Sequence, residues 1–72
     1  MALTPLERKI RLLRNGVTFA QIARELDPPV TTATVSMVNA GKRVSPRVER
    51  AIAEAIGLSV DRAFGTAAQG AA

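Results

Sequence analysis

Apolar residues recur every three or four positions along most of this chain, a spacing that predicts a series of short amphipathic helices. No segment shows the strict alternation of apolar and polar residues that is typical of a half-buried strand. Thr4 and Pro5 predict the start of the first helix, and Asn15-Gly16 predicts its end. The expected inner face of this helix consists of Leu6, Ile10, Leu13 and Val17.

The second and third helices are expected close together. Thr18 caps a helix that runs to about Leu26, and the prolines of Asp27-Pro28-Pro29 end it, since neither can donate an amide hydrogen. Thr31 or Thr32 then caps a third helix that Gly41 ends. The predicted buried residues of these two helices are Phe19, Ile22, Ala23, Leu26, Val35 and Val38.

Ser45-Pro46 predicts the start of a fourth helix, which ends at Gly57, and Ser59 predicts one more short turn of helix up to Phe64. The fourth helix is expected to bury Val48, Ile52, Ala55 and Ile56. The expected fold is therefore all-α: a compact bundle of four helices plus a short fifth, in one domain over residues 1–64. Residues 65–72 have little to bury, and they are expected to form a disordered tail.

The composition narrows the function classes. Ten Lys and Arg against six Asp and Glu give a net charge of +4, which favours a polyanionic partner. The chain has no Cys and no His, so disulfides, thiolate sites and imidazole ligands are excluded. No Gly-rich phosphate loop is present. We therefore expect no enzyme, cofactor or metal site. Neither a signal peptide nor a membrane span is visible, so a cytoplasmic location is expected.

The outer face of the third helix carries the most specific signal. It consists of small or uncharged residues: Thr31, Thr32, Ala33, Ser36, Met37 and Ala40. Hydroxyl residues are poor helix formers, so a short helix rich in them is costly unless that face has a role. A slim helix held from behind by Val35 and Val38 is suited to a DNA major groove, and these six residues are predicted to read base edges. The alternative is a plain helical hairpin with a polar surface.

A family resemblance follows from the order of these motifs. Residues 18–26 and 34–43 resemble the helix-turn-helix of lambda-repressor and Cro-like (Xre-type) regulators, and residues 52–64 resemble that family's last two helices. Residues 18–25 and 46–57 are similar to small Ner-like phage regulators, and residues 30–36 to the recognition helix of lac-repressor-type proteins. Phe19 and Asp27 depart from the family's usual glutamine and glycine, and the turn over Asp27-Pro28-Pro29-Val30 is expected to be extended.

The resemblance implies that the loop after the third helix lies against the DNA backbone. The predicted phosphate-binding residues are Thr18, Gln21, Lys42, Arg43 and Arg47. Thr18 to Gln21 contribute free amides at a helix start. For each cation the alternative is a solvated side chain, and this alternative is favoured for the basic residues of the first helix, Arg8, Lys9, Arg11 and Arg14.

The resemblance implies a sequence-specific regulator that binds double-stranded DNA, and a repressor of phage or mobile-element type is expected. Related proteins often bind inverted repeats as dimers, so a homodimer is expected at least on DNA. Leu58, Val60 and Phe64 would supply a pairing patch or close the core. No small-molecule effector and no membrane partner are expected. The alternative function is an antitoxin-like or protein-interaction module with the same fold.

Overall fold

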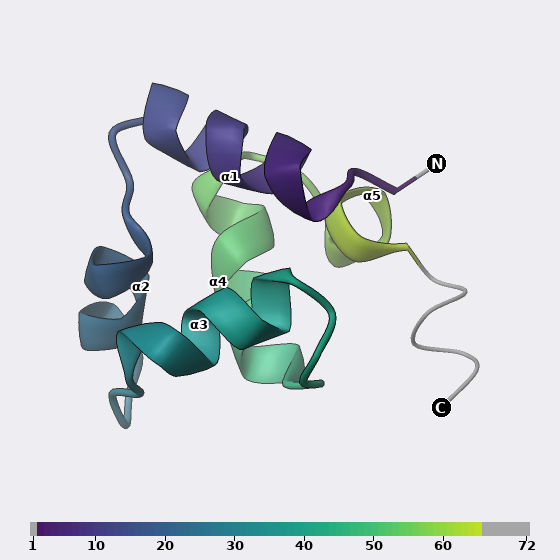
Figure 1. The fold of residues 1–72 in the computed structure, drawn as a ribbon. Coiled ribbons are helices and arrows are strands. Elements are labelled where there is room, and N and C mark those ends of the chain that lie inside the picture. Colours follow the sequence, from purple (N-terminus) through teal and green to yellow (C-terminus); the bar gives the residue numbers. More distant parts are fainter. Residues whose placement is uncertain (1, 66–72) are drawn as a thin grey trace.

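The computed structural model describes residues 2–65, which fold into five helices and contain no strand (Figure 1). The helices are α1 (Pro5–Arg14), α2 (Phe19–Glu25), α3 (Thr32–Asn39), α4 (Pro46–Ala55) and α5 (Val60–Phe64). The predicted all-α architecture is therefore confirmed. Apart from Gly65, the predicted tail at 65–72 lies outside the described residues.

Side-chain caps begin most of the helices where the sequence predicts them. The Thr4 hydroxyl accepts from the Glu7 amide at 3.1 Å, and the Glu7 carboxylate accepts from the Thr4 amide at 2.8 Å. This capping box lowers the pKa of Glu7, mainly through the hydrogen bond from the Thr4 backbone. Thr18, Thr31 and Ser59 cap their helices in the same way. Ser45 stands at the start of α4 without a side-chain cap bond.

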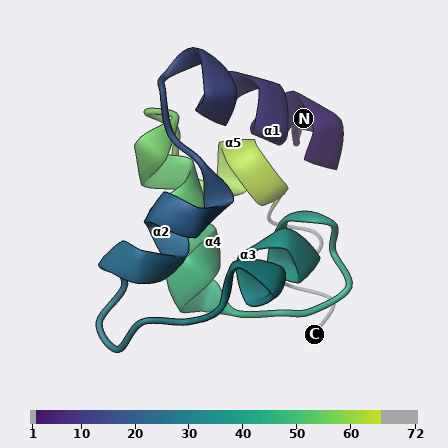
Figure 2. The ribbon, with the colours of Figure 1, turned by 60° about the vertical axis from the view of Figure 1, so that its left-hand side comes forward.

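The core forms around α4, which contacts each of the other four helices (Figures 1 and 2). The buried apolar side chains are Leu12, Ile22, Ala23, Val35, Val38, Val48, Ile52, Ala53, Ile56 and Ala63. Most of these positions match the predicted inner faces of the second, third and fourth helices. Leu58, Val60 and Phe64 pack half-buried against this cluster, so they close the core.

The predicted inner face of α1 is wrong. Leu6, Ile10 and Leu13 are exposed by 65%, 39% and 58%, whereas the helix buries Arg8 and Leu12. The pattern misleads because an arginine takes the inner position that an apolar residue normally fills. Residues 8 and 12 are four apart, so they share one face of the helix, and the three apolar residues stand on the other.

Arg8 is buried because every neighbouring element gives it a partner. Its guanidinium donates to the Asn39 side chain at 2.9 Å, to the carbonyls of Leu3 and Ala63 at 2.6 and 2.7 Å, and to the Asn39 carbonyl. The Phe64 ring covers it, with its centroid 4.1 Å from Cζ. Burial lowers the pKa of Arg8, and the charge of the buried Glu49 opposes this shift. Arg8 thus joins α1, α3 and α5.

Candidate nucleic-acid interface

Helices α2 and α3 pack directly on each other, and a connection over residues 26–31 joins them. Ala23 is 3% exposed, so its small side chain lets the two helices approach closely. The connection leaves α2 in an extended conformation at Leu26, contains a cis Asp27–Pro28 bond, and returns to α2 through a 3.0 Å bond from the Val30 amide to the Ala23 carbonyl. This hydrogen bond ties the residue before the Thr31 cap back to α2.

Helix α3 separates its residues cleanly between two faces. Val35, Val38 and Asn39 are at most 5% exposed and hold the helix against the core. All six residues predicted to read base edges are exposed, and none carries a charge: Thr31, Thr32, Ala33, Ser36, Met37 and Ala40. In both views α1 runs along one edge of the domain and α3 lies across from it (Figures 1 and 2). Ala33, Ser36, Met37 and Ala40 share the exposed side of α3, whereas Thr32 is its first residue and Thr31 its cap.

The start of α3 is stiffened by its own hydroxyls. Thr31 accepts from the Thr34 amide at 3.1 Å, and the two hydroxyl groups lie 2.9 Å apart. The Thr31 hydroxyl therefore satisfies an amide at the helix start. Its exposed side chain also lies at the edge of the candidate interface.

The end of α3 presents the two cations that follow it. Gly41 adopts a φ of +81°, which side chains other than glycine rarely tolerate. This turn lets the Gly41 amide bond to the Val38 carbonyl at 3.1 Å and the Lys42 amide to the Met37 carbonyl at 2.9 Å, a Schellman motif. Lys42 and Arg43 are exposed immediately beyond it. Arg43 also borders a hollow of about 180 Å³ with Val44 and Phe64.

The other predicted phosphate ligands have intramolecular roles in this structure. The Arg47 guanidinium donates to the carbonyls of Pro28 at 2.7 Å and Asp27 at 3.4 Å, so it braces the α2–α3 connection. Thr18 is exposed and caps α2. The Gln21 side chain donates to Glu25 at 3.3 Å and lines a groove between α2 and α4. Thr18, Gln21 and Arg47 thus each make a bond within the domain, whereas Lys42 and Arg43 are exposed directly after α3.

Asn39 is a buried position whose role in holding α3 in place the sequence reasoning missed. It is the last residue of α3, its carbonyl and side-chain oxygen accept from Arg8, and its side-chain amide donates to the Pro5 carbonyl at 3.1 Å. A signal was present, since Asn39 lies four residues after Val35 and so falls on the buried face. Through this pair α1 fixes the carboxyl end of the candidate reading helix.

No group of acidic, Cys or His residues that would hold a metal ion occurs among residues 2–65. The helices of this region are all too short or too polar to cross a bilayer. The chain matches no protein-family model, no curated protein and no solved structure.

Proposed function

We propose that this domain binds double-stranded DNA with sequence preference, as a transcription regulator of the helix-turn-helix type. The supporting observation is the division of α3: Val35, Val38 and Asn39 anchor it, whereas the six exposed residues on its outer side and at its two ends carry no charge. An α-helix with its side chains is about 10–12 Å wide, which suits a major groove about 12 Å wide. The small outer residues keep α3 within that width.

The charge distribution supports separate roles in this proposal for base contacts and for phosphate contacts. The reading face of α3 has hydroxyl and methyl groups, which contact base edges and thymine methyls, whereas Lys42 and Arg43 contact phosphates. A regulator of this size would bind an inverted repeat as a dimer, with one domain on each half-site.

Salt dependence of binding tests the proposal without knowledge of the operator. On a random duplex, the logarithm of affinity should fall by about 0.9 per log unit of salt for each phosphate contacted. Arg43→Ala should weaken binding and flatten this slope by roughly one contact. The matched control is Arg62→Ala, which removes an exposed arginine from α5. Equal slopes for wild type and Arg43→Ala would remove Arg43 from the interface, and the absence of binding at low salt would overturn the proposal.

A protein-interaction or antitoxin-like role is a second candidate, and the exposed apolar face of α1 favours it. Leu6 and Leu13 are more than half exposed, which is unusual for large apolar side chains placed together on one helix. These leucines are on a different helix from the predicted reading residues, so the two candidate functions are compatible.

A further inference from the structure

The outer face of α1 is an apolar strip that the fold leaves uncovered. Leu6, Ile10 and Leu13 provide three of the five large apolar side chains that residues 2–65 expose. Spacings of four and three residues place them on one side of the helix, opposite Arg8 and Leu12. The exposed cations of α1 stand beside this strip: Lys9, Arg11 and Arg14. We call these six residues the α1 strip.

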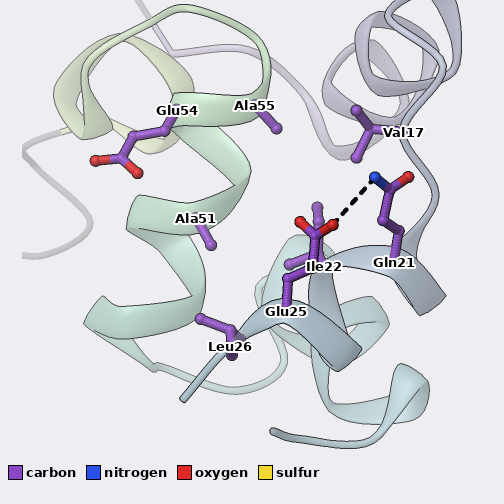
Figure 3. Close-up of a pocket in the computed structure, with 8 residues that line it drawn as sticks. All are labelled: Val17, Gln21, Ile22, Glu25, Leu26, Ala51, Glu54 and Ala55. Atoms are coloured by element: carbon purple, nitrogen blue, oxygen red, sulfur yellow. Dashed lines mark hydrogen bonds between the residues drawn. The ribbon is translucent and has the colours of Figure 1, made fainter. Parts of the chain in front are cut away.

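A second apolar surface, the groove between α2 and α4, has the opposite charge. It has a volume of about 430 Å³, and its apolar lining comes from Val17, Ile22, Leu26, Ala51 and Ala55. Ala51 and Ala55 are four residues apart on α4, and their small side chains leave the space open (Figure 3). Glu25 and Glu54 stand at its rim. We call this surface the α2–α4 groove.

The two surfaces are complementary in shape and charge. Leucine and isoleucine side chains project from the strip, whereas alanines hollow the groove. The strip is bordered by three cations with Glu7 as the one acid of its helix, and the groove is bordered by two carboxylates. One molecule cannot join them, because α1 turns Arg8 and Leu12 toward its own core and the strip away from it.

We propose that the α1 strip of one copy docks into the α2–α4 groove of a second copy. Such a contact joins two different surfaces, so a bound pair still offers one free strip, on one copy, and one free groove, on the other. The association is therefore head-to-tail and extends beyond a dimer as concentration rises. It involves neither the outer face of α3 nor Lys42 and Arg43, so it stands independently of DNA binding.

Sedimentation equilibrium without DNA tests this proposal. At low salt, as the protein concentration rises from about 10 μM to 1 mM, the average mass of the wild type should exceed that of a dimer, as for a weak association. Glu25→Lys with Glu54→Lys should weaken association at least tenfold, and so should Arg11→Glu with Arg14→Glu. Mixing these two double variants should restore it, because the intact strip of the first meets the intact groove of the second.

Matched variants separate this contact from general effects of charge and hydrophobicity. Asp61→Lys and Arg62→Glu change exposed charges on α5 and should leave the association unchanged. Leu6→Ser with Leu13→Ser should abolish the association. Val44→Ser should not, because Val44, although 68% exposed, lies outside both surfaces. Far-UV circular dichroism confirms that each variant is folded. A wild type that is monomeric throughout, a mass that stops at the dimer, or an association unaffected by the Glu25 and Glu54 substitutions would each overturn the proposal.

Discussion

Helices α1 and α3 both pack one face against the core, but they differ in which kind of residue they bury there. Helix α3 buries valines and exposes small uncharged residues, so its pattern of apolar positions identifies the buried face correctly. Helix α1 buries an arginine and exposes two leucines and an isoleucine, so its pattern identifies the wrong face. The spacing of apolar residues thus reports which face of a helix is apolar, and in this domain that face is not the buried one where a charged side chain is buried.

The buried carbonyl groups that need a hydrogen-bond donor in this core lie at helix ends. The carboxyl ends of α3 and α5 leave the carbonyls of Asn39 and Ala63 without partners in their own helices, and both accept from Arg8. A cation also interacts favourably with the negative end of a helix dipole. An arginine at position 8 donates hydrogen bonds to these carbonyls, which a leucine cannot do. It also holds the carboxyl end of α3, the candidate reading helix, in place.

Arg8→Ala should have the largest effect on stability. It removes the donor from three buried or half-buried carbonyls. Each buried acceptor left without its donor costs about 1–3 kcal/mol, so the total loss should be about 3–5 kcal/mol, a large share of the stability of a small domain. Urea unfolding followed by circular dichroism measures it. Arg11→Ala, at an exposed site on the same helix, should change stability by less than about 0.5 kcal/mol. Equal effects would contradict the buried role of Arg8.

Adjacent leucines on α1 test its orientation. Leu12 is 1% exposed, so Leu12→Ala should destabilise the fold by about 2–5 kcal/mol through lost burial and a cavity. Leu13 is 58% exposed, so Leu13→Ala should cost less than about 0.5 kcal/mol. Thermal melts of the two variants compare them directly. The reverse order would mean that α1 is rotated and that its original predicted face is the buried one.

The same comparison on α3 should give a smaller difference. Val35→Ala removes a fully buried side chain and should cost about 1–3 kcal/mol. Met37→Ala should leave the free energy of unfolding nearly unchanged, because Met37 is on the exposed face. If Met37→Ala proved the more damaging of the two, the assignment of the reading face would have to be abandoned.

The sequence predicted the helices and their caps because these depend on local chemistry. Thr4, Thr18, Thr31 and Ser59 all cap the helices they precede, as hydroxyls before an amphipathic run should. The burial of Arg8 depends on carbonyls up to 55 residues away, and the bracing of the turn by Arg47 depends on carbonyls 19 and 20 residues away. Spacing along the chain carries no information about such partners, so both arginines were expected at the surface or on DNA.

The central claim is that the exposed face of α3 reads base edges, and a protein-binding array tests it most directly. Wild type, Thr32→Ala and Ser36→Ala should each bind random DNA about equally, since their phosphate contacts are the same. Their preferred bases should differ at one or two positions per half-site, with a discrimination near the lower end of the usual 1–3 kcal/mol per mismatch, because no arginine on this face grips guanine with two hydrogen bonds. One identical preferred site for all three proteins would contradict the claim.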